Sequence, residues 1–407
     1  MKPSNSISAI EPAKDEKIGN NRWRVDRNEV SRLGQAGKTC SEIARLQGVT
    51  YQAIDYHLKK IRYRQGEKQD RPKVDYNQRI NWRVYNEGLV KRGEVFLELS
   101  IFKDWSEELD RMNKGKAGRP YDFPDSFIRF LMELKCRYKI GYRETEGIAR
   151  KLCALIPACK KAPDYSTLQK RFESLEIVLA VYQNREAQEV AIDSSGIKTS
   201  NRGEYKTLRY DGAKKKKYIK IHIELNIKSN QVIACEVTTS DVADSQMAGD
   251  LITEGQKQGL IKKGLMDSGY DSKGVYNELM DEEIEPVIKP ARKGDLSGAQ
   301  ERYQRLKEKK DLSKEERAVL SRLEVVIEYL TDSQKWKDKT GYGMRWSVEG
   351  FFSAFKRILS DAVFSRKYEL MVKELKMKCS IMNLFREICK GYRKTEEDVE
   401  TVVKVPA

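Results

Sequence analysis

The sequence predicts an α/β domain that follows a largely helical region. Two segments, Tyr218 to Ile227 and Gln231 to Ser240, alternate apolar and polar residues at period two and flank a short turn, which is typical of a β-hairpin. Beyond them, strand-like and helix-like stretches alternate up to residue 290. With the short apolar strand at Glu189–Asp193, the order is three strands, helix, strand, helix, strand, which indicates an α/β fold.

The composition points to a polyanionic partner. The chain has 407 residues, enough for two or three domains, and a formal net charge of +16 with 34% charged residues. Such a balance says little about fold but favours nucleic acid as a partner. Ribosomal and chromatin structural proteins share this charge, but they are usually shorter or of lower complexity.

The cysteines and the apolar segments indicate a cytoplasmic protein. Only two histidines accompany seven dispersed cysteines without a C-x-x-C pair, which favours reduced thiols over a disulfide scaffold or a zinc finger. The N-terminal segment lacks the apolar stretch of a signal peptide. A run of about 18 apolar residues, which a membrane span needs, occurs nowhere in the sequence, so we expect no membrane contact.

The N-terminal part predicts a helix-turn-helix within residues 26–64, after a polar tail at 1–25. Apolar positions of a first helix end at Gly48, and Thr50 could cap a second helix that carries Ile54 and Leu58. The second helix would present four side chains to DNA. They are Tyr51, Gln52, Lys59 and Lys60. An ordinary helical hairpin is the alternative.

The remaining boundaries follow changes in composition. We expect a linker at 65–81, a helical DNA-contacting region at 82–185, the first part of the α/β core at 186–293, a charged helical insertion at 294–335, the second part of the core at 336–395 and a tail at 396–407. A plain helical packing layer is nearly as good an interpretation of 82–185. For the insertion, a solvated helical hairpin is favoured over a catalytic role.

A basic run directly precedes the second strand and could contact DNA phosphates without sequence preference. It consists of Lys214, Lys215, Lys216 and Lys217. A solvated loop is the alternative interpretation.

Two aspartates end predicted strands of the α/β core. Asp193 closes the first strand and Asp267 the fourth, and strand ends are where α/β sheets build sites. Two converging carboxylates repel each other, and a divalent cation with hard oxygen ligands, Mg²⁺ or Mn²⁺, removes that cost. Asp271 competes with Asp267 for this role, and a turn or cap is the alternative for either residue.

The stretch from Tyr342 to Lys356 places charged groups among aromatic residues. Wound as one helix, Tyr342, Arg345, Glu349 and Lys356 fall on one face. Glu349 could add a third oxygen ligand, and Arg345 and Lys356 could hold phosphates. A solvated face with an i, i+4 ion pair is the other possibility.

These residues together resemble the DDE transposases of bacterial and archaeal insertion sequences, most closely the insertion-sequence five (IS-five) family. The family signature is Tyr, two residues, Arg, three residues, Glu, six residues, Lys, and Tyr342 to Lys356 fills every position. A-I-D-S-S-G-I-K and D-S-G-Y-D look like the blocks of the first and second acids. The resemblance covers roughly residues 82–390; the 294–335 insertion and the N-terminal helix-turn-helix look like additions to shorter members.

The resemblance implies an RNase H-like core, a mixed five-stranded sheet flanked by helices, with Asp193, Asp267 and Glu349 as catalytic metal ligands for Mg²⁺ or its substitute Mn²⁺. It implies a transposase that binds the terminal inverted repeats of its element and cleaves and joins DNA strands in a cut-and-paste reaction. It would act at least as a homodimer on double-stranded DNA and associate with the nucleoid. The rivals are an inactive DNA-binding regulator and a metal-dependent nuclease of the same fold.

Overall fold

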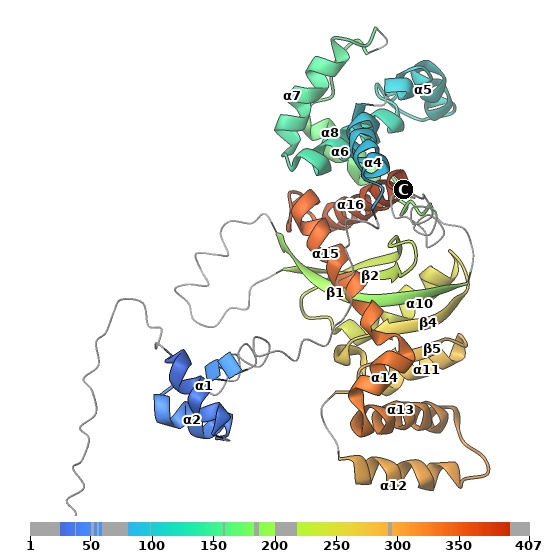
Figure 1. Cartoon of the computed structure of the whole chain (residues 1–407). Coiled ribbons are helices and arrows are strands. Elements are labelled where there is room, and N and C mark those ends of the chain that lie inside the picture. The colour runs from blue at the N-terminus through green and yellow to red at the C-terminus, as the bar shows by residue number, and fades with distance from the viewer. Residues whose placement is uncertain are drawn as a thin grey trace, which may run out of the picture. The chain divides into compact units, whose positions relative to one another are not determined.

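The computed structural model describes residues 25–36, 38–49, 53–54, 57–58, 80–97, 99–157, 159–182, 187–199, 218–291 and 295–390. These belong to two compact units, Met1–Gln78 and Arg79–Ala407 (Figure 1). Among the helices of these residues, none has both the length and the apolar character needed to cross a membrane.

The first unit contains the two helices α1 (Arg27–Gln35) and α2 (Cys40–Gln47) and helical backbone at 53–54 and 57–58. Thr39 and Glu42 form a capping box at the start of α2, and Gly48 ends it in the left-handed region with φ 63°. A small core holds these segments together: Val30, Ile43, Ala44, Ile54 and Leu58. The predicted first helix and its glycine turn are therefore present, and residues 53–54 and 57–58 are helical where the second helix was predicted. Tyr51, Gln52, Lys59 and Lys60 lie outside the described residues.

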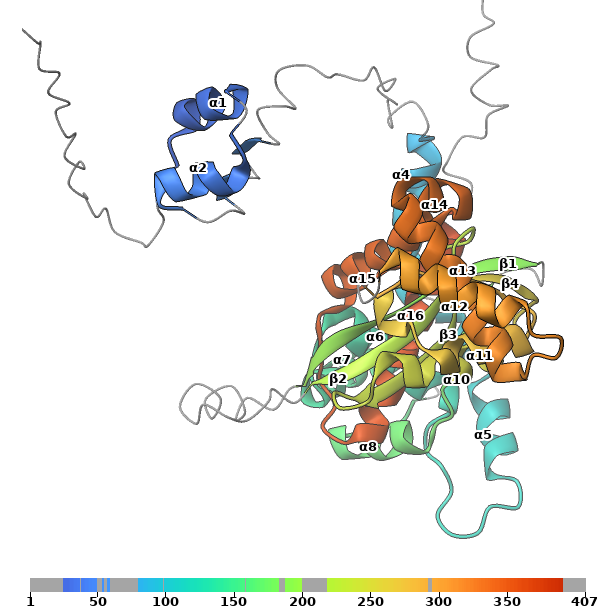
Figure 2. The same cartoon turned by 90° about the horizontal axis from the view of Figure 1, so that it is seen from below.

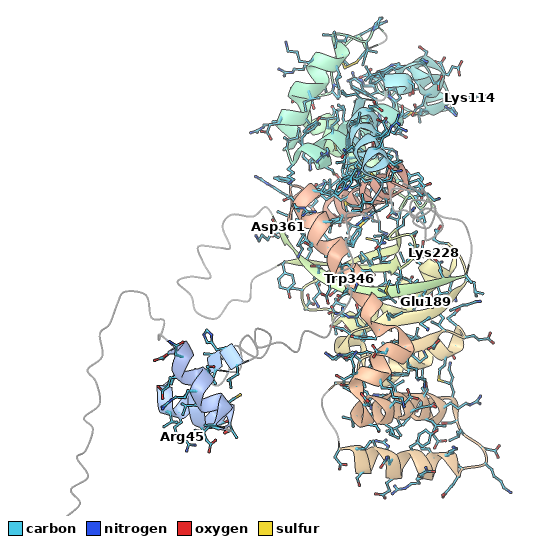
Figure 3. All side chains as sticks on the ribbon, viewed as in Figure 1. Arg45, Lys114, Glu189, Lys228, Trp346 and Asp361 are labelled. Carbon is cyan, nitrogen blue, oxygen red and sulfur yellow. A yellow bond between two sulfur atoms is a disulfide. The ribbon has the colours of Figure 1, made fainter. Side chains whose placement is uncertain are left out.

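The second unit begins with a helical region, as predicted. Its elements are α4 (Trp82–Glu94), the 3₁₀ helices η1 (Val95–Leu97) and η2 (Leu99–Phe102), α5 (Trp105–Asn113), α6 (Asp125–Tyr138), α7 (Tyr142–Cys153) and α8 (Tyr165–Ser174). Asp164 caps α8 by accepting a hydrogen bond from the Thr167 amide at 2.6 Å. The basic loop between α5 and α6 leaves Lys114 exposed (Figure 3).

A mixed sheet forms the centre of the second unit. Its strands are β1 (Gln188–Thr199), β2 (Ile219–Asn226), β3 (Val232–Thr239), β4 (Ile261–Met266), β5 (Glu285–Ile288) and β6 (Ala362–Val363). In the order β3-β2-β1-β4-β5, the pairs among β1, β2 and β3 are antiparallel, and β4 and β5 run parallel to β1. This is the helix-flanked RNase H-like sheet that the resemblance implied, and the short β6 adds a sixth strand beside the end of β1.

One predicted strand end is wrong. β1 does not stop at Asp193 but continues to Thr199. The extension exists because β2 keeps pairing with β1 as far as Ile197 and β6 pairs with Lys198 and Thr199. These partners come from distant parts of the chain, so the local pattern around Asp193 could not reveal them.

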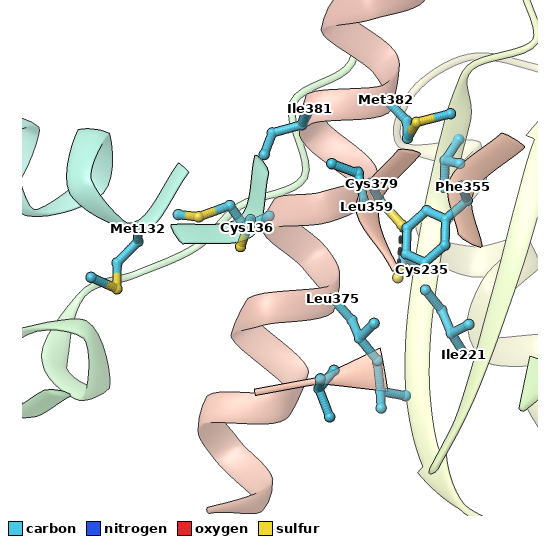
Figure 4. Close-up of a cluster of buried hydrophobic side chains, with 14 of the residues drawn as sticks. Met132, Cys136, Ile221, Cys235, Phe355, Leu359, Leu375, Cys379, Ile381 and Met382 are labelled. Atoms are coloured by element: carbon cyan, nitrogen blue, oxygen red, sulfur yellow. Dashed lines mark hydrogen bonds between the residues drawn. The ribbon is translucent and has the colours of Figure 1, made fainter. Parts of the chain in front are cut away.

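The two faces of the sheet carry separate cores because successive residues of a strand point to opposite sides. On one face, Ala191 and Ile221 pack with residues of α15 (Trp346–Leu359) and α16 (Tyr368–Ile388), including Phe355 and Leu375 (Figure 4). On the other, Val190 and Ile192 pack with residues of α10 (Ala248–Gln256) and α11 (Lys273–Asp281), while the 3₁₀ helix η3 (Asp244–Met247) leads into α10.

A buried ionic cluster joins the helical region to the sheet. Glu374 of α16 binds Lys135 of α6 and Lys378 of its own helix, each at 3.1 Å, and all three side chains are at most 1% exposed. Glu374 also accepts hydrogen bonds from the amides of Phe364 and Ser365, and Lys378 donates to the carbonyl of Ala362 in β6. Burial alone would raise the pKa of Glu374, but these lysines and amides lower it to about 2.

A disulfide joins Cys153, at the end of α7, to Cys159. The expectation of reduced thiols throughout is therefore wrong for this pair. The turn after α7 brings the two Cα atoms to 5.1 Å, within the range that a disulfide requires. The other cysteines are free: Cys40, Cys136, Cys235, Cys379 and Cys389.

Glu224 of β2 is a fully buried acid facing α10. Neither of its carboxylate oxygens has a hydrogen-bond partner within the described residues. Gly255 of α10 lies against this carboxyl group, where any Cβ would collide with it. Burial raises the pKa of Glu224 well above its ordinary value, which favours the protonated side chain in the folded protein.

We expect Glu224→Met to raise the free energy of unfolding by about 1–3 kcal/mol at pH 8, because it removes an unpartnered buried polar group. Because the folded-state pKa of Glu224 is raised above its ordinary value of 4.5, the ionisation of Glu224 lowers the stability of the folded protein as the pH rises above 4.5. The gain should therefore be larger at pH 8 than at pH 5 in urea unfolding. Glu254→Met, at an exposed position of α10, is the control. An equal gain at both pH values would contradict a buried protonated acid.

Candidate functional site

Asp193 and Asp267 lie next to each other on adjacent strands. Ile192 of β1 pairs in parallel register with Met266 of β4, and each aspartate is the next residue of its chain segment. β4 ends at Met266, and Asp267 caps the 3₁₀ helix η4 (Ser268–Tyr270) by accepting a hydrogen bond from the Gly269 amide at 2.8 Å. The two acids therefore meet where β4 ends, although β1 continues.

Glu349 reaches this place from the first turn of α15. Arg345 bonds Asp193 at 3.1 Å through one guanidinium nitrogen and Glu349 through another. α15 begins at the exposed Trp346, the residue after Arg345 (Figure 3). One arginine thus links the first and third predicted acids.

The stretch from Tyr342 to Lys356 is not one regular helix. Tyr342–Arg345 form the 3₁₀ helix η5, and the α-helix begins only at Trp346. The reason is Gly341, which ends the preceding helix with φ 70° and redirects the chain. Arg345 and Glu349 nevertheless keep their i, i+4 contact.

The surroundings of Asp193 carry an excess of negative charge. Burial is the main cause that raises its pKa, to about 6, and the nearby charges of Asp267 and Glu349 raise it further. The Ser194 amide, which donates to Asp193 at 2.8 Å, and the Arg345 guanidinium oppose the shift. An acid whose ionisation is disfavoured in this way gains from a bound cation.

Tyr342 is buried next to Arg345 and does not lie on the surface. It is 8% exposed, its ring is 5.1 Å from that of Trp336, and the Arg345 guanidinium is 5.9 Å from its centroid. Burial raises the pKa of Tyr342 to about 12, so the phenol is neutral at physiological pH. Direct DNA contact by Tyr342 does not fit this burial, and the ring instead supports Arg345.

The other predicted DNA contacts are only partly described. Lys356 is half-buried on α15, seven residues after Glu349 and so on the same side of the helix. The pKa of nearby Asp361 is lowered mainly by a hydrogen bond from Lys198 and also by the charge of Lys356. The basic run Lys214, Lys215, Lys216 and Lys217 lies outside the described residues.

Asp271, the competitor of Asp267, is engaged elsewhere. Its side chain is fully buried and accepts hydrogen bonds from Arg322 at 2.5 and 2.7 Å and from the Ala291 amide at 2.9 Å. Its oxygens are therefore occupied within the protein, which leaves Asp267 as the acid beside Asp193. Arg322 comes from the charged insertion, and no sequence signal set it apart from the other basic residues there.

The donor set suits a hard divalent cation, because Asp193, Asp267 and Glu349 offer only carboxylate oxygens. Within the described part of the chain, however, no three His, Cys, Asp or Glu side chains stand close enough to hold a metal ion. Arg345 supplies the positive charge between Asp193 and Glu349. The residues suit a cation by the chemistry of their oxygens, but in this arrangement Arg345, and not a group of three carboxylates around one point, lies between Asp193 and Glu349.

Comparison with solved structures finds transposases. A Drosophila P element transposase strand transfer complex matches with 12% identity and a TM-score of 0.28, covering 76% of this chain and 90% of that one. A pre-cleavage Mos1 transpososome matches with 11% identity and a TM-score of 0.18, covering 77% of this chain and 81% of that one. A Mos1 mariner paired end complex with Mn matches with 9% identity and a TM-score of 0.18, covering 74% of this chain and 96% of that one. These TM-scores are too low for any geometric comparison.

Comparison with protein families is more specific. Two family models, both described as a transposase DDE domain, match residues 184–384 and 90–202. The first match contains Asp193, Asp267 and Glu349, and the second contains most of the helical region that precedes the sheet. This chain therefore carries a transposase DDE domain.

Proposed function

We propose that this transposase, of the IS-five type, binds the terminal inverted repeats of an insertion sequence and catalyses divalent-metal-dependent strand cleavage and strand transfer. The observation that carries the proposal is the adjacency of Asp193 and Asp267 on neighbouring strands, with Glu349 linked to Asp193 through Arg345. Three acids from distant parts of the sequence thereby share one charged site.

Asp193, Asp267 and Glu349 would hold Mg²⁺, or Mn²⁺ as a substitute. A bound ion supplies Lewis-acid stabilisation of the phosphodiester and an activated nucleophile. Arg345 orients the Asp193 and Glu349 carboxylates, and Lys356 provides a cation for phosphate on the same side of α15.

Two displacements at phosphorus account for the proposed reaction. In the first, a water oxygen bonds to phosphorus at the element end, and the bond from phosphorus to the 3′ oxygen breaks to leave a 3′-OH. In the second, this 3′-OH attacks a phosphodiester of target DNA, and a target 3′ oxygen leaves with a proton. Neither step requires a covalent link between protein and DNA, so no serine or tyrosine nucleophile is invoked.

DNA recognition would fall to the first unit and to the helical region. The helices and glycine turn of residues 26–64 suit end recognition. The exposed loop that contains Lys114 and Arg119 suits phosphate contacts that weaken as salt rises. Joining two element ends to one target implies a homodimer on the DNA, and such a protein would associate with the nucleoid.

The test is incubation of the purified full chain with DNA that carries the element's own ends, a target plasmid and Mg²⁺ or Mn²⁺. We expect cleavage at the ends and covalent joining to the target. Cleavage without joined product would identify a nuclease, and end binding without cleavage in either metal would identify a DNA-binding regulator. Either outcome would overturn the proposed function.

A further inference from the structure

The charged insertion is helical, and one of its helices packs against the rest of the second unit. It folds as α12 (Leu296–Lys307) and α13 (Lys314–Thr331), and α14 (Ser333–Thr340) follows. α13 packs between α12 and α11 (Figures 1 and 2). Ala318 of α13 is buried in the core that also contains Val275 and Leu279 of α11, so the insertion is docked on the sheet and its helices.

α13 contacts the turn that carries Asp267 through Arg322. Arg322 binds both carboxylate oxygens of Asp271, a charge-assisted fork that fixes position and direction. Asp267 and Asp271 cap the two ends of the short helix η4, whose Tyr270 is fully buried. The single 3₁₀ turn of η4 separates Asp271, which binds Arg322, from Asp267, which lies beside Asp193.

Further along the chain, the same helix leads to the residues around Glu349. Tyr329 of α13 contacts Trp336 of α14 edge to face at 5.3 Å, and Trp336 contacts Tyr342 at 5.1 Å. Tyr342 lies beneath Arg345, which binds Glu349. Lys339 of α14 also bonds Glu328 of α13 at 2.6 Å. A continuous series of contacts therefore runs from the turn of Asp267 to Arg345.

We propose that α13 is a brace that sets the position of Asp267 relative to Glu349, and that Arg322 is its positioning residue. The two acids lie on segments that are far apart in the sequence, and α13 contacts supports of both. The inference rests on the proposed function for its catalytic meaning, whereas the brace itself is a property of the fold.

The test uses Arg322→Met and Arg322→Lys in the full chain, with Arg305→Met as the matched control. Arg305 lies on the outer helix α12 and pairs with exposed Glu301, so Arg305→Met removes the same charge from the same insertion. Peptide-level hydrogen exchange over residues 267–272 reports on the turn directly. Thermal unfolding, binding of element ends and strand cleavage are measured on the same samples.

With Arg322→Met, we expect exchange in this turn to accelerate about tenfold or more, because a bidentate charge-assisted pair is lost. Cleavage should fall by a similar factor while end binding is unchanged. Arg322→Lys, which keeps the charge but loses the fork, should lie between wild type and Arg322→Met. Arg305→Met should match wild type in every measurement.

Unchanged exchange at 267–272 in folded Arg322→Met would overturn the brace, whatever the activity. If Arg322→Met fails to fold, Arg322→Lys decides by the same measurement. If exchange accelerates as expected but the wild type cleaves no DNA, the brace stands and the proposed function fails. Accelerated exchange with wild-type cleavage would show that the brace does not serve the reaction and would overturn the positioning role.

Discussion

Glu349→Gln is expected to lower strand cleavage by about 10³-fold or more, because losing a metal-binding carboxylate removes several kcal/mol of transition-state stabilisation. Binding of the element ends should remain, since Glu349 contributes no positive charge to the DNA contact. The measurement is single-turnover cleavage of labelled end DNA in Mg²⁺ and in Mn²⁺, beside a binding assay on the same preparation.

Asp193→Asn and Asp267→Asn should behave in the same way as Glu349→Gln. Glu369→Gln, at an exposed position of α16, is the control and should cleave like wild type. Asp271→Asn should lose far less activity than Asp267→Asn, because Asp271 acts through Arg322 and its neighbours. Full activity in Glu349→Gln would show that another acid completes the site, and the reverse order for Asp271 and Asp267 would exchange their roles.

Glu374→Ala is expected to lower the free energy of unfolding of the second unit by about 3–5 kcal/mol, because it leaves two buried ammonium groups without their counter-ion. It would also leave the amides of Phe364 and Ser365, next to β6, without their hydrogen-bond acceptor. Urea unfolding at neutral pH measures the loss. The matched control is Glu173→Ala, which breaks an exposed pair with Lys367 and should cost at most about 1 kcal/mol.

The stabilisation by Glu374 should also depend on pH in a defined direction. Because the folded-state pKa of Glu374 is lowered to about 2 from an ordinary value of 4.5, its contribution is complete above pH 4.5 and is lost as the pH falls towards 2. The difference in unfolding free energy between wild type and Glu374→Gln should therefore shrink from pH 6 to pH 3. A difference that is constant over this range would contradict an ionised Glu374.

Local patterns were sufficient for most secondary structure. Period-two alternation predicted β2 and β3, and the turn between them contains Asn230 at a positive φ of 54°. The Gly48 turn was predicted correctly because it depends on neighbouring backbone groups alone. The acids Asp193, Asp267 and Glu349 were proposed from their sequence blocks, and their catalytic role stays a prediction.

Sequence alone therefore determined the α/β class and the helical N-terminal regions, which follow from contacts within a few residues, and it proposed the candidate acids through their motifs. Tertiary structure decided that β1 continues past Asp193, that Tyr342 is buried and that Asp271 is held by Arg322. Each of these outcomes depends on a partner distant in the chain. The sequence neighbours of a residue cannot specify such a partner, because the pairing is selected by the packing of whole elements. It is also selected by the free-energy cost of leaving a buried charge or backbone group unpaired.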